Sequence, residues 1–183
     1  MRRAGISKNA VVGFLDESSH HPNVNTARLW SFGKLRIKKN TAKKERVNSF
    51  GFYALNGKSV YSTKDSSKKE NVIEFLEEIK EKNGGKQIVV VLDNFSSHTS
   101  VKVKEIAKKL GIVLVFLPPY SPDLNPIEFI WKSIKRELSS MFLRCKEEVK
   151  YVVEVLFHKL SSSLSFAKRW IEKFLMPIEV VLE

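Results

Sequence analysis

Two short apolar runs on either side of an amphipathic segment constrain the fold of this chain more than any other feature. The runs are "QIVVVLDN" at residues 87–94 and "IVLVFLPP" at residues 112–119. Continuous apolar runs of this length are typical of strands that are covered on both faces. The segment between them, "TSVKVKEIAKKLG", starts with Ser/Thr residues and ends with Gly, and therefore predicts a helix. A right-handed strand–helix–strand crossover makes the two strands parallel.

The residues before these runs predict the antiparallel side of the same sheet. "NAVVGFLDES" at 9–18 and "ARLWSFG" at 27–33 predict strands, and "VNSFGFYALNGKSVYST" predicts a hairpin that turns at Asn56-Gly57. Helical spacing of apolar residues marks further segments, at 67–85, from Pro126 onward, at 145–160 and at 166–175. The predicted fold class is α/β: a mixed five-stranded sheet, with an antiparallel meander plus parallel strands, flanked by helices and followed by extra C-terminal helices. We expect a single domain over residues 1–183 because no repeat or linker divides the chain.

The charge of the chain indicates a polyanionic partner. Lys and Arg number 32 against 20 Asp and Glu, which gives a formal net charge of +12. Such an excess is typical of nucleic-acid-binding proteins, although a well-solvated surface is an alternative explanation. The single cysteine, Cys145, excludes an internal disulfide and fits a reducing compartment. No apolar stretch approaches the roughly 20 residues of a membrane helix, so we expect an intracellular protein without a membrane partner.

Three carboxylates are predicted to converge at one edge of the sheet. Asp16 follows the apolar run "VVGFL", and Asp93 follows "IVVVL". Ligand sites of open α/β sheets lie at the carboxyl ends of their strands. Glu128 is in the first turn of the helix that begins near Pro126, and it joins the two aspartates if that helix packs over the same edge. Clustered carboxylates repel one another unless a cation lies between them, and oxygen ligands suit Mg²⁺ or Mn²⁺.

Glu128 also has a purely structural interpretation. It lies in "LPPYSPDLNPIEFIWKSIKREL" at 117–138, which has four prolines before the helix. Asn125 can cap this helix, and Glu128, three residues later, can complete a capping box. The apolar residues of the segment form a stripe that predicts a buried helix face, made of Ile127, Ile130, Trp131, Ile134 and Leu138. Capping and metal binding do not exclude each other.

The chain resembles the DDE endonuclease domain of mariner-superfamily transposases, including those of insertion sequences. The resemblance lies in "LDESSHHPNVNTARLWSFGK", "VVVLDNFSSH" and "LPPYSPDLNPIEFIWKSIKREL". It implies a ribonuclease-H-like fold and gives Asp16, Asp93 and Glu128 the roles of catalytic and metal-binding residues. The 34 residues between Asp93 and Glu128 match the spacing of that superfamily.

The resemblance also implies a function and its partners. The expected activity is metal-dependent DNA strand cleavage and strand transfer with two Mg²⁺ or Mn²⁺ ions, on transposon ends and target DNA. The expected setting is the nucleoid of a prokaryote, with a homodimer as one arrangement. Full-length members carry helix-turn-helix modules before this domain, whereas fifteen residues precede Asp16, so we expect none here. Two alternatives remain open, a non-catalytic remnant that binds nucleic acid through its basic surface and another ribonuclease-H-like nuclease.

Several further residues are weaker candidates for DNA contacts. Lys132 and Lys135 fall on the same flank of the predicted helix as Glu128, and His98 lies in the loop after Asp93. The basic segment 34–46 is predicted to form a hairpin tip, whose candidates are Lys38, Lys39, Lys43 and Lys44. A solvated side chain is the alternative at each of these positions. Glu17 is interpreted as an exposed residue rather than a fourth acid of the site, and Trp30 as a core residue rather than a base-stacking platform.

Overall fold

The computed structural model describes residues 7, 9–22, 32–33, 46–119 and 121–174. Most of the strand predicted at 27–33 therefore lies outside the described residues, and Phe32 and Gly33 form a bend instead of a strand. Trp30 and the basic segment, with Lys38, Lys39, Lys43 and Lys44, also lie outside them. The predictions for those residues stay untested.

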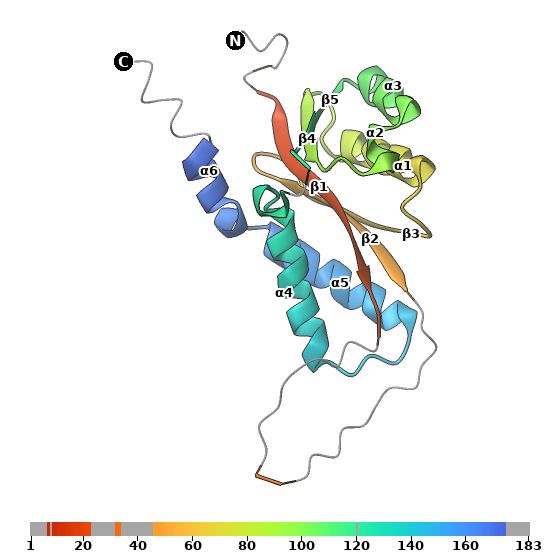
Figure 1. Ribbon diagram of the computed structural model, residues 1–183, viewed down its shortest axis with the longest axis vertical. Coiled ribbons are helices and arrows are strands. Elements are labelled where there is room, and N and C mark those ends of the chain that lie inside the picture. The colour runs from red at the N-terminus through yellow and green to blue at the C-terminus, as the bar shows by residue number, and fades with distance from the viewer. Residues whose placement is uncertain (1–6, 8, 23–31, 34–45, 120, 175–183) are drawn as a thin grey trace.

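A mixed five-stranded sheet forms the centre of the molecule (Figure 1). Its strands are β1 (Val11–His20), β2 (Val47–Ala54), β3 (Val60–Lys64), β4 (Ile88–Leu92) and β5 (Ile112–Phe116), in the order β3-β2-β1-β4-β5. The first three strands form an antiparallel meander, while β4 is parallel to β1 and β5 is parallel to β4. The predicted fold class, a mixed sheet with antiparallel and parallel sides, is confirmed.

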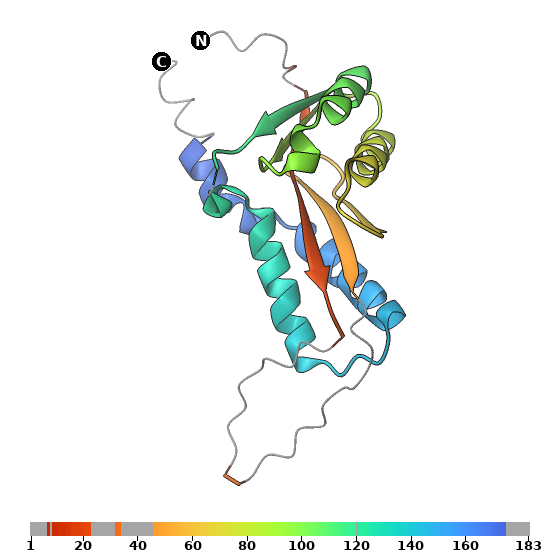
Figure 2. The ribbon, with the colours of Figure 1, turned by 45° about the vertical axis from the view of Figure 1, so that its right-hand side comes forward.

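Helices cover both faces of this sheet (Figures 1 and 2). One face carries α1 (Lys69–Lys82), the short α2 (Ser96–Thr99) and α3 (Val101–Lys109), and the other carries α4 (Ile127–Ser140) and α5 (Lys146–Ser161). The 3-10 turn η1 (Pro122–Leu124) precedes α4, and η2 (Leu164–Phe166) and α6 (Lys168–Phe174) end the described chain. Within the described ranges, no helix has the length and apolar character needed to cross a membrane.

The two helical layers bury opposite faces of β1. Because side chains alternate along a strand, Leu15 packs into the cluster of α1 and α3, while Phe14 packs into that of α4 and α5. Both side chains are fully buried. The predicted apolar stripe of α4 is entirely buried against this second face, which holds the helix beside β1.

A glycine lets the aromatic residues of α4 and α5 approach the sheet closely. A Cβ atom on Gly51 of β2 would lie 2.6 Å from the Trp131 ring and 2.7 Å from the Phe157 ring. Gly51 is the antiparallel partner of Asp16 in β1, and directly paired residues point to the same face. The side chain of Asp16 therefore points toward the layer that contains α4.

A buried neutral histidine ends the same strand. His20 is 1% exposed, its ring packs 5.7 Å from the Trp131 ring, and neither ring nitrogen has a hydrogen-bond partner among the described residues. Burial lowers the pKa of His20 to about 3, and the positive charges of Lys135 and His21 contribute to this decrease. The native state therefore disfavours protonation of His20.

Replacing His20 by Phe is expected to remove an acid sensitivity of the fold. The pKa of His20 is lower in the folded than in the unfolded chain, so its stability contribution is present above about pH 6.5 and is lost as the pH falls toward 3. At pH 5 this loss is about 2 kcal/mol, which the variant should not show. Urea unfolding at pH 7.5 and pH 5.0 measures the difference. The same comparison with His158→Phe, at an exposed position of α5, is the control, and an equal pH effect in both variants would contradict this expectation.

Candidate active site

The three predicted carboxylates line one cavity of about 630 Å³. Asp16 comes from β1, Asp93 from the residue after β4, and Glu128 from the first turn of α4. The cavity is otherwise lined by residues of the segments that follow β4 and β5, namely Asn94, Phe95, Leu117, Pro118, Pro119, Ser121 and Asn125. The fold thus brings together side chains that are far apart in the sequence.

Asp16 lies within its strand and not at the strand's end. The sequence predicts a strand that ends in acid, whereas β1 continues to His20 because β2 pairs with it from Gly13 to His20. The parallel partner β4 pairs only with Val11–Phe14 of β1. Asp16 therefore lies just beyond the last parallel pair, where the cavity begins beside β4.

Asp93 is held by one of its carboxylate oxygens. Its Oδ1 accepts hydrogen bonds from the backbone N–H of Phe95 at 3.0 Å and from Nδ1 of His98 at 2.7 Å. The hydrogen bond from His98 is the largest cause of the lowered pKa of Asp93, and the side chain is 54% exposed. Among the described residues no hydrogen bond is donated to Oδ2, so this oxygen is available to a ligand in the cavity.

The predicted capping of α4 by Asn125 is wrong. The helix begins at Ile127 after Pro126, and no side chain of the described ranges caps it. Only the backbone carbonyl of Asn125 accepts a hydrogen bond from the N–H of Glu128, at 3.1 Å. The Asn125 side chain is instead buried at the cavity wall, where its Oδ1 has no partner among the described residues. A capping box is therefore absent at this helix start, and Glu128 faces the cavity at the positive end of the α4 dipole.

The proline-rich connector is tied to the end of β4. The N–H of Leu117 donates to the carbonyl of Leu92 at 2.8 Å, and the Asn94 side chain donates to the carbonyl of Leu117. Pro118 and Pro119 follow and line the cavity. These contacts fix where the chain leaves the sheet, and hence where α4 begins relative to Asp93.

The negative charges in the cavity act on one another. Burial raises the pKa of Asp16 well above its ordinary value, and the charges of Glu128, Glu17 and Asp93 raise it further. Three carboxylates are the hard oxygen donors that Mg²⁺ or Mn²⁺ prefers. In the described part of the chain no three His, Cys, Asp or Glu side chains lie close enough to form a ready-made metal site. The donor set and the mutual repulsion nevertheless fit a divalent cation in this cavity.

A buried histidine joins Asp93 to Glu17, an arrangement that sequence reasoning missed. His98 of α2 is fully buried, and its Nε2 lies 3.0 Å from Oε1 of Glu17. Burial lowers the pKa of His98, but the hydrogen bonds and charges of Asp93 and Glu17 outweigh it and raise the pKa to about 10. The ring is therefore a charged imidazolium between two carboxylates.

Two expectations about this cluster change as a result. The side chain of Glu17 is only 13% exposed, so its interpretation as an exposed residue is wrong. The ring of His98 is not a solvated loop side chain, and both its nitrogens are occupied, which leaves it no atom for a direct DNA contact. Strand alternation could have suggested this arrangement, because neighbouring residues such as Asp16 and Glu17 point to opposite faces.

Neither candidate lysine of α4 lines the cavity. Lys132 and Lys135 are both exposed, but they have different neighbours. The Lys132 ammonium lies 5.2 Å from the centre of the Phe129 ring, whereas the charge of Lys135 acts on His20. A contact of Lys132 or Lys135 with DNA stays a prediction.

Comparison with known proteins identifies the family. The family described as DDE superfamily endonuclease matches residues 11–150. The chain belongs to this family. Among curated relatives, the Tc1 transposase of Caenorhabditis elegans is 31% identical over 90 residues, 45% of this chain and 33% of the relative. The Tcb2 transposase of Caenorhabditis briggsae is 39% identical over 54 residues, 30% of this chain and 20% of the relative. The matched regions are thus a minor part of these relatives.

Solved structures of Mos1 transposase share the fold of this chain. The Mos1 transposase paired-end complex with left transposon end superposes with a TM-score of 0.66 and 17% identity, over 87% of this chain and 53% of that one. The Mos1 transposase catalytic domain with Raltegravir and Mn superposes with a TM-score of 0.63 and 16% identity, over 88% of this chain and 76% of that one. The predicted ribonuclease-H-like fold and the resemblance to mariner-type DDE transposases are confirmed.

Proposed function

We propose that the chain is a transposase catalytic domain that cleaves DNA strands in a metal-dependent reaction and joins the freed 3′-hydroxyl to target DNA. The observation that carries this proposal is the convergence of Asp16, Asp93 and Glu128 on one cavity of a DDE superfamily endonuclease. The net charge of +12 supports DNA as the partner. Pairing of two copies on two transposon ends belongs to the same proposal.

The residues of the chain have separate tasks in this reaction. Asp16, Asp93 and Glu128 would hold Mg²⁺ or Mn²⁺, and a bound ion would supply activation of the attacking water or hydroxyl and stabilisation of the leaving oxygen. The hydrogen bonds from Phe95 and His98 hold the Asp93 carboxylate in place through Oδ1, which leaves Oδ2 available to an ion in the cavity. Glu128 is placed by the buried stripe of α4. The positioning therefore comes from elements that are packed into the core.

Magnesium is expected to stabilise the protein through Asp16. An ion that binds only the folded state stabilises it by about 2.7 kcal/mol at 100 times its dissociation constant. Asp16→Asn should weaken this effect, and it should leave the metal-free protein equally or more stable, because it removes a partly buried carboxylate of raised pKa. Asp16 is a sharper choice than Asp93, which also binds His98. Thermal unfolding with Mg²⁺ and with EDTA measures both effects.

The control is Asp65→Asn, which removes the same charge from an exposed position after β3. An equal shift of the unfolding temperature by Mg²⁺ in Asp16→Asn and in the wild type would place the ion outside the cavity.

Nicking of a supercoiled plasmid in Mg²⁺, Mn²⁺ or EDTA tests the proposed activity. DNA binding without nicking would favour the non-catalytic remnant, and faster cleavage of an RNA–DNA hybrid would favour another ribonuclease-H-like nuclease.

A further inference from the structure

A second hollow, of about 750 Å³, lies between α4 and the C-terminal helix α6 and is here called the α4–α6 groove. Five basic residues line it, two from α4 and three from α6: Lys132, Arg136, Lys168, Arg169 and Lys173. All five are exposed, and Asp123 is the one acidic residue in the lining. The groove therefore has a strong positive charge that suits a phosphate backbone.

Aromatic side chains share the groove with these charges. Phe129, Phe166, Trp170 and Phe174 line it, and Phe129 and Phe174 are 40% and 37% exposed. The Lys173 ammonium lies 5.3 Å from the centre of the Phe174 ring, an arrangement like that of Lys132 and Phe129. Exposed rings beside lysines combine a stacking surface with positive charge. Proteins that bind single-stranded nucleic acid use these two features together.

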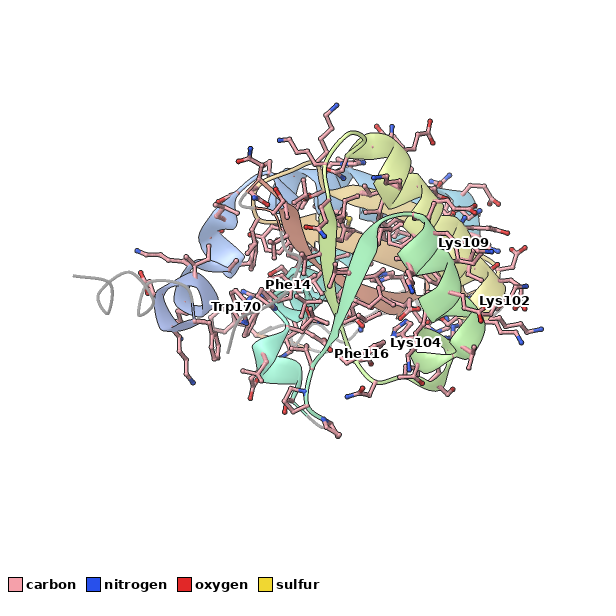
Figure 3. All side chains as sticks on the ribbon, turned by 90° about the horizontal axis from the view of Figure 1, so that it is seen from above. Phe14, Lys102, Lys104, Lys109, Phe116 and Trp170 are labelled. Atoms are coloured by element: carbon pink, nitrogen blue, oxygen red, sulfur yellow. The ribbon has the colours of Figure 1, made fainter. Side chains whose placement is uncertain are left out.

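The aromatic wall is anchored to the core of the domain. The rings of Trp170 and Phe14 lie 4.9 Å apart in an edge-to-face contact, and Figure 3 shows the two side chains lying close together between α6 and β1. Phe174 packs in turn against Trp170, at 5.2 Å between ring centres. The position of α6 is thus fixed by the same strand that carries Asp16.

The α4–α6 groove and the carboxylate cavity share a wall. Along the chain, Ser121, Asn125 and Glu128 line the cavity, whereas Asp123, Leu124, Pro126 and Phe129 line the groove. The turn η1 and the first turn of α4 therefore separate the two hollows, and α6 lies beside this point in both views of the ribbon (Figures 1 and 2). A DNA strand that leaves the carboxylate cavity across this wall would enter the α4–α6 groove.

We propose that the α4–α6 groove binds unpaired nucleotides of the DNA strand next to the cleavage position. In a duplex the base faces are covered by neighbouring bases, so aromatic side chains can stack only on bases that have left the helix. The proposal rests on the proposed function for its choice of DNA. The binding itself requires no metal and no cleavage, so it is measured separately from the activity.

The test is fluorescence anisotropy in EDTA with a labelled 12-nucleotide oligothymidylate and with a 12-base-pair duplex. The double variant Phe129→Leu/Phe174→Leu removes both exposed rings and keeps the groove apolar. Its affinity for the single strand is expected to fall about tenfold or more, as for the loss of a base–aromatic stack, and its affinity for the duplex less than twofold. The matched control is Phe142→Leu, at a 49% exposed ring that does not line the groove. An equal loss on the duplex, or the same loss in the control, would overturn the proposal.

The charges of the groove give an independent measurement. Arg136→Gln/Lys173→Gln is expected to flatten the dependence of single-strand affinity on salt by roughly 0.7 per contact. The control pair, Lys102→Gln/Lys109→Gln, removes two exposed charges from α3, which point away from the core (Figure 3). An equal change of slope in both pairs would overturn the assignment of the charges.

Photo-crosslinking of a single-stranded DNA oligonucleotide that contains bromodeoxyuridine needs no variant of the protein. We expect crosslinked peptides from residues 129–136 and 166–174, and crosslinks confined to other segments would overturn the proposal. Loss of plasmid nicking with these binding results intact would count against the proposed function alone.

Discussion

Replacing Glu128 by Gln is expected to lower metal-dependent DNA nicking by about 10³-fold, the scale of losing a preorganised charge-stabilising group from an active site. The metal-free protein should stay at least as stable as the wild type. After burial, the charge of Glu128 is the largest cause of the raised pKa of Asp16, so a neutral amide removes repulsion from the cavity. The helix should also tolerate the change, because no side-chain cap is lost at the start of α4.

Plasmid nicking and urea unfolding in EDTA measure the two effects on one preparation. The matched control is Glu137→Gln, which removes the same charge from an exposed position of α4 outside the cavity. It should retain the nicking rate of the wild type. A loss of stability above about 1 kcal/mol in Glu128→Gln, the typical effect of a removed helix cap, would favour the purely structural interpretation of this residue.

Replacing His98 by Gln is expected to destabilise the fold by about 3 kcal/mol, because breaking a buried ion pair leaves its partner charges uncompensated. Gln cannot supply the positive charge between Glu17 and Asp93. Without the bond from His98, the N–H of Phe95 would be the one donor left to the Asp93 carboxylate among the described residues. Nicking should therefore fall as well, by about 10²-fold, the scale of a misplaced catalytic group.

The pH dependence separates this charge effect from a packing effect. The pKa of His98 is about 10 in the folded chain and about 6.5 when unfolded, so its contribution is complete below pH 6.5 and is lost as the pH rises toward 10. The stability difference between the wild type and His98→Gln should therefore shrink from pH 6 to pH 9.5 in urea unfolding. Ser97→Ala, on the same helix, removes a buried hydroxyl that has no hydrogen-bond partner in the described part of the chain, and it should show no such trend. A difference that is constant with pH would mean that the imidazolium is not what stabilises the cluster.

The sheet could be predicted from the sequence because its patterns are local. Continuous apolar runs specified β4 and β5, and the Asn56-Gly57 turn specified the hairpin of β2 and β3. The spacing of apolar residues likewise gave the buried face of α4. Each of these patterns lies within a short window, where the period of the element decides which side chains face the core.

The details of the site depend on long-range contacts that no local pattern encodes. Glu17 and His98 are 81 positions apart, and the exposure of either depends on the other. The side chain of Asn125 had a suitable position for a cap, but it faces the cavity wall instead. Local patterns pointed to Asp16, Asp93 and Glu128. The hydrogen bonds of His98 to Asp93 and Glu17 arise only from the packing of β1, β4 and α2.

The adjacent positions of Asp16 and Glu17 in β1 limit how this strand can change during evolution. One carboxylate faces the cavity, and the next bonds to His98 near the opposite helical layer. A one-residue insertion or deletion upstream in β1 would exchange the faces of every following side chain. It would turn Asp16 away from the cavity and break the bond of Glu17 in a single event. We therefore expect a change in the length of β1 to damage the site more than a single substitution elsewhere in the strand.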